Sequence, residues 1–331
     1  MKSSVNHATL TSLAEHEAGT LSVSTTYLVL SSLARYQQYL KERAPLKQFV
    51  SLAAVIGAVA AFGTQVFFYG QMKDIPVIMA SFVAVLFLLL RLRLVDELKD
   101  LEHDRLFYPD RPVVRGLVSP REVAQAAAWV FLIETLIATT GGIKALSAFA
   151  LVALYSFLTL REFFIRKWLR RHFTVYVVSH ELLVLPVCYY LYSLNGLTSH
   201  HVMHPYFYLL TAFIAGHFFV LEVTRKLRPR ELDQDSRDTY TARYGIVNSC
   251  ILSGLLALWV MVTGIFTAAT FSGRALGLGY AGLFLLGPFI FSLLTFARRP
   301  CLSTSKDVFN WCVGLVVGTS ILFILNMGLV L

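Results

Sequence analysis

The sequence predicts an all-α, polytopic membrane protein in which about nine transmembrane helices form a bundle around a central cavity that opens to the cytoplasmic side. Three observations predict this fold class: a strongly apolar composition, a succession of long apolar runs, and basic residues concentrated in alternate connections. Apolar residues make up 56% of the 331 residues and charged residues 15%, with a mean hydropathy of +0.63. Because about a quarter of a soluble domain is usually charged, this composition excludes an ordinary soluble protein.

Each apolar run is long enough to cross a bilayer as a helix, which takes about 20 residues at a rise of about 1.5 Å per residue. In chain order, the runs cover residues 49–70, 75–95, 121–141, 143–163, 173–194, 205–224, 246–270, 275–297 and 308–330. The borders of the second and fourth runs are the least sharply defined. Together the runs predict a nine-helix transmembrane domain over residues 46–331.

Lysine and arginine residues orient the predicted helices, because short loops retain positive charge on the cytoplasmic side. The N-terminal arm and the even-numbered loops hold 26 of the 29 basic residues, and the other loops hold only Lys73, Lys144 and Arg274. We therefore expect the N-terminus and the even-numbered loops in the cytoplasm, in a bacterial inner membrane or an organelle equivalent. The net charge of +9 follows from this topology and requires no nucleic-acid partner.

Residues 1–45 form a polar N-terminal arm of mixed charge, which we expect to be cytoplasmic and to lack a secretory signal. Residues 27–41 can form an amphipathic helix with Leu28, Leu33 and Tyr36 on its apolar side. We interpret this helix as an anchor on the cytoplasmic membrane surface. A functional role for the arm is the alternative.

Three aspartates spaced four residues apart follow the second run. Asp96, Asp100 and Asp104 would share one face of a helix, where their charges repel one another. Carboxylates gathered at a membrane boundary indicate a binding site for a divalent cation, and Mg²⁺ usually combines a few carboxylates with substrate phosphates. The pattern therefore indicates a magnesium-dependent diphosphate site. A solvated acidic helix face is the alternative.

A second charged group follows the sixth run. Glu222 precedes Arg225 and Lys226 by three and four residues, a spacing that also suits a simple ion-pair set at a helix end. The loop that follows adds Asp233, Asp235 and Asp238. Since both acidic groups follow even-numbered spans, we expect them on the same side of the membrane. In a closed bundle they could face each other across the cavity and hold one polyanion through bridging metal ions.

The first of these groups carries a family resemblance. The stretch Asp96-Glu-Leu-Lys-Asp100-Leu-Glu-His-Asp104, followed by Arg111-Pro112, resembles the first aspartate-rich motif of the UbiA superfamily of intramembrane prenyltransferases, N/D-x3-D-x3-D with a trailing R-P. The resemblance extends from about residue 46 to the C-terminus, through the nine spans and both acidic loops. The second motif departs from the family, because Glu222 and a looser group of aspartates stand in place of its D-x3-D arrangement.

The resemblance implies a Mg²⁺-dependent enzyme that transfers a prenyl group from a prenyl diphosphate to a lipophilic acceptor, aromatic or otherwise, within membrane lipid. Mg²⁺ would be held by Asp96, Asp100, Asp104, Glu222, Asp233 and Asp238. The departing diphosphate would be neutralised by Lys99, Arg111, Arg161, Arg225 and Lys226. His180 would contact the acceptor or act as a base, with a structural hydrogen bond between helices as the alternative.

Two other functions remain open from the sequence. A membrane terpene cyclase of the same superfamily would ionise a prenyl diphosphate without any acceptor, and the altered second motif leaves room for it. An ion-coupled transporter could use the acidic groups to bind a translocated cation, although carriers tend to bind their ions near the bilayer midplane. A P-loop would need a glycine-rich run ending in Gly-Lys-Ser/Thr, which the sequence lacks.

Overall fold

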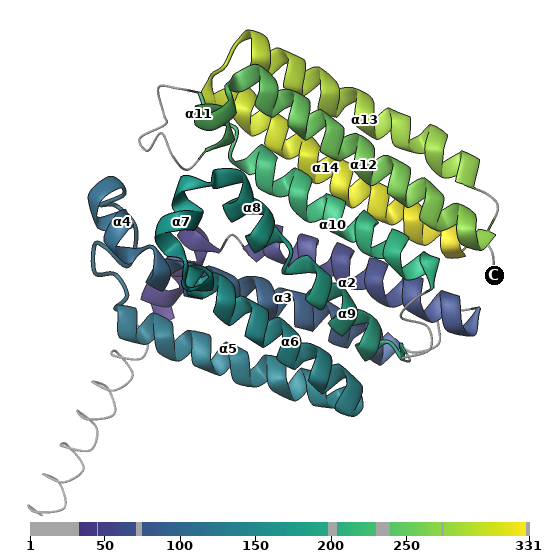
Figure 1. The fold of residues 1–331 in the computed structure, drawn as a ribbon, viewed down its shortest axis with the longest axis horizontal. Coiled ribbons are helices and arrows are strands. Elements are labelled where there is room, and N and C mark those ends of the chain that lie inside the picture. The colour runs from purple at the N-terminus through teal and green to yellow at the C-terminus, as the bar shows by residue number, and fades with distance from the viewer. Residues whose placement is uncertain are drawn as a thin grey trace, which may run out of the picture.

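The computed structural model describes residues 33–44, 46–70, 75–197, 204–229, 239–272 and 275–328, and it is helical with no strand in these ranges (Figure 1). Within them, nine helices are long and apolar enough to cross a membrane, which confirms the predicted polytopic all-α fold. A helix of residues 33–43, here called the N-terminal helix, precedes the spans. The other elements are α2 (Leu46–Tyr69), α3 (Ile75–Lys99), α4 (Leu101–Phe107), α5 (Pro120–Thr140), α6 (Gly142–Leu160), the 3₁₀ turn η1 (Glu162–Phe164), α7 (Arg166–Arg171), α8 (Phe173–Glu181), α9 (Val184–Leu194), α10 (Pro205–Arg225), α11 (Tyr240–Tyr244), α12 (Ile246–Ser272), α13 (Ala275–Arg298) and α14 (Leu302–Gly328).

The spans form two groups that meet at α2 (Figure 1). One group consists of α10, α12, α13 and α14, and the other runs from α3 through α5 and α6 to α9. Helix α2 contacts members of both groups, so it lies at the centre of the bundle. Its closest neighbour is α3, because a Cβ atom at Gly57 would lie only 2.8 Å from the backbone of Phe82. A small residue is needed for two membrane helices to approach this closely.

Helix α5 begins one residue before the predicted run, at a complete capping box. The Ser119 hydroxyl accepts a hydrogen bond from the Glu122 backbone N–H at 3.2 Å, and the Glu122 carboxylate accepts one from the Ser119 N–H at 2.7 Å. Pro120 follows at the first helical position, where a missing N–H costs nothing. These local interactions fix the start of the helix that forms one wall of the site.

Helix α3 continues to Lys99, four residues beyond the predicted run, so Arg91 and Arg93, which we counted among the basic residues of the second loop, lie within the helix. Arg91 is buried, and its Nε donates a hydrogen bond to Oε2 of Glu134 in α5 at 2.5 Å. The pairing offsets the desolvation cost that would otherwise keep a guanidinium out of an apolar span. Hydropathy cannot reveal such a pair, because it scores each residue without its partner.

The fifth span is a broken helix, divided into α8 and α9. Pro186 has no backbone N–H, and its ring crowds the carbonyl of Leu182, which favours a break or kink in the helix at this point. The Leu182 carbonyl instead accepts a hydrogen bond from the Leu185 N–H at 3.1 Å. No residue of α8 is buried, whereas eight of the 11 residues of α9 are. The break therefore separates the segment that ends in His180 and Glu181 from the packed core.

Candidate diphosphate site

The ends of α3, α8 and α10 bring charged side chains together at one end of the bundle. The guanidinium of Arg225 interacts electrostatically with Asp96 of α3, Glu181 of α8 and Glu222 of its own helix. The residues that follow the second and sixth spans are therefore neighbours in the fold. Glu181 adds a carboxylate from a third helix.

A cavity of about 390 Å³ begins beside these charges and extends along α3. Asp96, Lys99 and His180 lie at its polar end, and Arg91 lies at its other end. Lys99 and Arg91 are eight residues apart, which corresponds to about 12 Å along the helix axis at a rise of about 1.5 Å per residue. Most of the remaining lining is apolar and comes from α3, α5 and α6, including Phe157. The cavity can therefore hold a charged group at one end and an apolar chain along its length.

Lys99 and His180, which we predicted as catalytic residues, contact each other at the polar end of the cavity. Nζ of Lys99 lies 3.3 Å from Nε2 of His180 and 3.3 Å from the hydroxyl of Tyr176. Nδ1 of His180 lies 2.7 Å from the Tyr176 carbonyl oxygen, which can only accept a hydrogen bond. Nδ1 therefore carries a proton, and Nε2 is left to accept a hydrogen bond from the Lys99 ammonium group.

Glu162 approaches Lys99 from a strained turn. Glu162, Phe163 and Phe164 have φ angles of 46°, 52° and 61°, in the left-handed region. Each such residue other than glycine costs on the order of 1–3 kcal/mol, and this strain tends to occur at functional sites. Glu162 is buried, and its Oε1 lies 3.9 Å from Lys99 Nζ and 3.5 Å from Arg166 Nε. The turn thus holds a carboxylate beside the ammonium group of the cavity.

Asp104 is not among the residues that line the cavity, whereas Asp96 is. Helical backbone hydrogen bonds still run from Asp104 N–H to Asp100 O at 2.8 Å and from Asp100 N–H to Asp96 O at 2.9 Å. Helix α3 ends at Lys99, and Asp100, with φ of −96° and ψ of 6°, connects it to α4. Asp104 is buried and forms an ion pair with Arg111, with Nδ1 of His103 3.6 Å from the same carboxylate oxygen. The change of direction at Asp100 and the pairing with Arg111 separate the third aspartate from the first.

The remaining carboxylates still fit a magnesium ion. Among the described residues, no three His, Cys, Asp or Glu side chains gather closely enough to hold a metal ion by themselves. Asp100 lies near enough to Asp96 for their charges to repel. One or two carboxylates are the usual protein contribution to a Mg²⁺ site, and substrate phosphates and water supply the other ligands. Asp96 and Asp100 thus suit an ion that binds together with a diphosphate.

The other predicted residues have different environments. Glu222 pairs with both of its basic neighbours: Oε2 lies 2.5 Å from Arg225 Nε, and Oε1 lies 2.7 Å from Lys226 Nζ. Arg161 is exposed, and its guanidinium lies over the Phe157 ring at 5.6 Å from the ring centre. Asp233, Asp235 and Asp238 lie outside the described residues.

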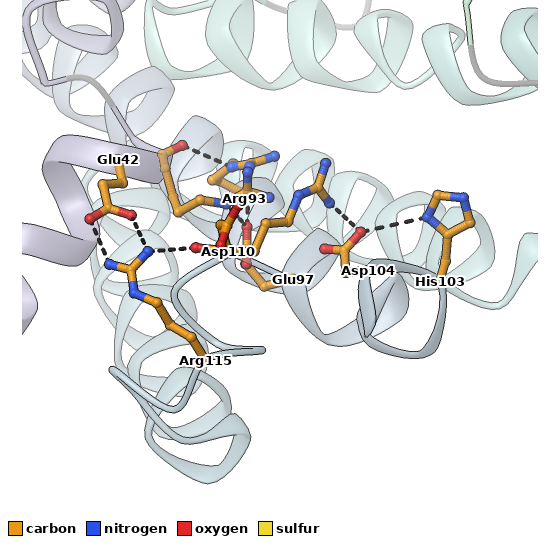
Figure 2. A network of polar contacts seen from close by, with 9 residues as sticks. Glu42, Arg93, Glu97, His103, Asp104, Asp110 and Arg115 are labelled. Atoms are coloured by element: carbon orange, nitrogen blue, oxygen red, sulfur yellow. Dashed lines mark hydrogen bonds and ion pairs between the residues drawn. The ribbon is translucent and has the colours of Figure 1, made fainter. Parts of the chain in front are cut away.

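The N-terminal helix packs against the end of α3 and the loop before α5 (Figure 2). Glu97 is ion-paired with Arg43, and its Oε1 lies 3.1 Å from Nη2 of Arg93. Arg93 Nε also donates to the carbonyl oxygen of Arg43 at 2.8 Å. Nearby, Nη2 of Arg115 lies 2.7 Å from the Glu42 carboxylate. These contacts fix the orientation of the segment that carries Asp96 and Asp100.

The buried side of the N-terminal helix differs from the apolar side that we predicted. Tyr39 is 3% exposed, whereas Leu33 and Tyr36 are 53% and 37% exposed. Leu28 lies outside the described residues. Tyr39 belongs to a small apolar cluster with Leu94 of α3 and Val118 of the following loop. The described helix therefore packs against protein through Tyr39.

Several charged residues around the site were not assigned to it from the sequence, namely Arg43, Arg91, Glu97, Glu134, Glu162 and Glu181. Glu134 and Glu181 carry a usable signal, because a carboxylate within an apolar span is costly and usually has a partner or a function. Arg43 and Glu97 give no such signal. They pair across 54 positions of sequence, and only the fold brings them together.

No protein-family model and no curated protein matches the chain in sequence. Its structure is similar to the apo structure of a UbiA homolog from Aeropyrum pernix K1, with a TM-score of 0.59 and 16% identity over 85% of this chain and 98% of that one. It is also similar to a structure described for digeranylgeranylglyceryl phosphate synthase in membranes, with a TM-score of 0.56 and 16% identity over 89% of this chain and 99% of that one. The chain therefore has the fold of the UbiA superfamily, as its first aspartate motif indicated.

Proposed function

We propose that this protein is a Mg²⁺-dependent intramembrane prenyltransferase that moves a prenyl group from a prenyl diphosphate to a lipophilic acceptor. The observation that carries the proposal is the junction of a charged group with an apolar cavity. Asp96 and Lys99 belong to both, since they line the cavity and interact with charges on α10 and η1. A prenyl diphosphate has the same division into a polyanionic head and an apolar chain.

The charged residues divide into those that would hold the metal and those that would bind the diphosphate directly. Asp96 and Asp100 would hold Mg²⁺, whereas both carboxylate oxygens of Glu222 are paired with Arg225 and Lys226. When bound, Mg²⁺ would neutralise the negative charge that builds on the diphosphate as it departs. Lys99 and Arg225 supply N–H donors at the same end of the cavity, where a low dielectric strengthens their attraction for an anion.

The apolar part of the cavity would protect the allylic cation that remains after the diphosphate leaves. Such a cation reacts with water, so its survival requires a dry lining. Phe131 and Phe157 line the cavity and can stabilise a cation through the faces of their rings. Arg91 would not repel the cation strongly, because its charge is neutralised by Glu134 at 2.5 Å.

His180 would accept the proton that an acceptor loses when it forms its new bond. Its Nδ1–H is occupied by the Tyr176 carbonyl, so Nε2 is the nitrogen with a free electron pair. That pair faces Lys99, 3.3 Å away. As Lys99 turns toward the diphosphate, Nε2 becomes available to a proton from the acceptor.

The test is an incubation of the purified protein with Mg²⁺ and prenyl diphosphates of increasing length, with and without a mixture of aromatic and quinone-precursor acceptors. Released diphosphate and a prenylated acceptor would support the proposal. A cyclic hydrocarbon formed without acceptor would identify a terpene cyclase instead. No diphosphate release under any condition would refute both enzymatic functions and favour a carrier.

Paired variants test the role of the first motif. Asp100→Asn should lower Mg²⁺-dependent diphosphate release by at least about 100-fold, since it removes a charged metal ligand. Asp110→Asn is the matched control, because Asp110 is an exposed aspartate in the adjacent loop. Equal activity of the two variants would contradict the assignment of Asp100.

A further inference from the structure

Tyr240 carries a buried hydroxyl group that no described residue satisfies. The residue is 3% exposed, and its hydroxyl oxygen has no hydrogen-bond partner in the described part of the chain. A buried polar group without a partner costs about 1–3 kcal/mol. Because native structures contain few such groups, each one calls for an explanation, and a ligand absent from the structure is one.

The surroundings of Tyr240 identify the ligand's chemistry. Its phenol group interacts electrostatically with Glu222, Glu181 and Arg225, the same residues that meet at the charged end of the cavity. A phenol is neutral near pH 7, so the hydroxyl can donate a hydrogen bond to an anion without adding negative charge.

Tyr240 is also held in a fixed position. It begins the short helix α11, which Thr239 caps by accepting a hydrogen bond from the Ala242 N–H at 3.2 Å. The hydroxyl of Thr241 accepts a hydrogen bond from the Arg228 N–H at 3.3 Å, which joins α11 to the segment after α10. The Tyr240 ring packs edge-on against Phe173, with ring centres 5.5 Å apart. A donor held in this way loses little conformational freedom when a ligand binds.

We propose that the hydroxyl of Tyr240 donates a hydrogen bond to an oxygen of the bound diphosphate. A diphosphate supplies several acceptor oxygens and lies, on the proposed function, at the charged end of the cavity. This inference rests on that function. It adds a neutral donor from the region of the second acidic motif, where the sequence had indicated only charged residues.

Binding of inorganic diphosphate in the presence of Mg²⁺, measured by isothermal titration calorimetry, tests the proposal without turnover. Tyr240→Phe should weaken binding at least about tenfold, because a hydrogen bond to a charged group is lost. Its melting temperature in the absence of ligand should stay the same or rise, since phenylalanine removes an unpaired buried hydroxyl. This combination separates a ligand-binding group from one that only supports the fold.

Tyr190→Phe provides the matched control. Tyr190 in α9 is 4% exposed, and its hydroxyl also lacks a hydrogen-bond partner among the described residues. The same loss of one oxygen atom in Tyr190→Phe should leave the diphosphate affinity within about twofold of wild type, a smaller change than the loss of one hydrogen bond to the ligand would cause. A comparable loss of affinity in both variants would overturn the proposal.

Two further results would also overturn it. One is an unchanged affinity in Tyr240→Phe, whatever its melting temperature. The other comes from an experiment that does not depend on the folding of Tyr240→Phe. 3-Fluorotyrosine introduced at position 240 of the otherwise unchanged protein should show a shifted ¹⁹F resonance when diphosphate is added, and an unshifted resonance refutes the contact. If wild-type protein does not bind diphosphate at all, the proposed function fails as well. If wild type binds it and Tyr240→Phe binds it equally well, only this inference fails.

Discussion

Replacing Glu134 by glutamine should destabilise the protein by about 3–5 kcal/mol, because it leaves the Arg91 guanidinium unpaired within the membrane span. The side chains of Arg91 and Glu134 are 7% and 2% exposed, and their Nε and Oε2 atoms are 2.5 Å apart. With an effective dielectric constant of about 20, Coulomb's law gives an attraction of about 6–7 kcal/mol at this distance. Hydration compensates for little of this lost attraction, since neither side chain becomes exposed. The expected loss of stability is smaller than the full attraction because the structure around Arg91 relaxes in part.

The double variant Arg91→Leu/Glu134→Leu should be far more stable than either single variant. Replacement of a buried ion pair by apolar residues is often neutral or stabilising by about 1–4 kcal/mol, because both desolvation costs disappear together. The free energy of unfolding can be measured in mixed micelles by titration with a denaturing detergent, followed by far-ultraviolet circular dichroism. The double-mutant cycle then gives the coupling energy between the two residues.

A coupling energy below about 1 kcal/mol, the value usual for exposed ion pairs, would refute this reasoning. It would mean that water reaches Arg91 or Glu134 in the folded protein. Glu122→Gln is a suitable control, because Glu122 lies at the start of the same helix and its partner Arg35 is 41% exposed. That variant should lose no more than about 2 kcal/mol, the range for a helix cap.

Two other predictions follow from the charged contacts around the site. Lys99→Met should raise the KM for a prenyl diphosphate at least about tenfold, since an ammonium group at the cavity is lost. Lys144→Met, at an exposed position near the start of α6, should leave KM unchanged. Steady-state kinetics that show equal KM values for the two variants would contradict the role of Lys99. The pKa of Glu42 lies below its ordinary value of 4.5, mainly because Arg115 donates hydrogen bonds to its carboxylate. This contact should therefore stabilise the protein above about pH 4.5, and its effect should be lost as the pH falls through the lowered pKa. Accordingly, the difference in melting temperature between wild type and Glu42→Gln should be constant near neutral pH and disappear in acid, and a difference that persists in acid would argue against the contact.

The fold class was accessible from the sequence because each span carries its own signal. A run of about 20 apolar residues must be helical in lipid, whatever its neighbours are. Eight of the nine described spans begin or end within two residues of the predicted runs. The exception is the last span, which begins at Leu302, six residues before the predicted start. Helix α3 ends four residues beyond its predicted run, because Arg91 and Arg93 lower the hydropathy of a helix that continues to Lys99. The break at Pro186 was likewise hidden from hydropathy, since proline in an apolar run does not lower the average enough to divide it.

The chemistry of the site was only partly accessible. The four-residue spacing of Asp96, Asp100 and Asp104 is a local pattern, and Asp96 lies where charged residues of α3, α8 and α10 come together. The pattern could not show that Asp104 pairs with Arg111 while Asp96 borders the cavity. That outcome depends on the change of direction at Asp100 and on where the following loop places its arginine.

The sequence by itself therefore determined a nine-span helical bundle and the positions of its acidic and basic residues along the chain. Only the tertiary structure decided which of these residues interact: Lys99 with His180 and Glu162, Arg225 with Asp96 and Glu181, and Tyr240 with Glu222 and Glu181. The physical reason is the range of the interactions. The preference of each helix for lipid depends on its own residues and can be predicted from a local window of sequence. Ion pairs and hydrogen bonds instead join residues that are distant in sequence, and they form only once the helices have packed.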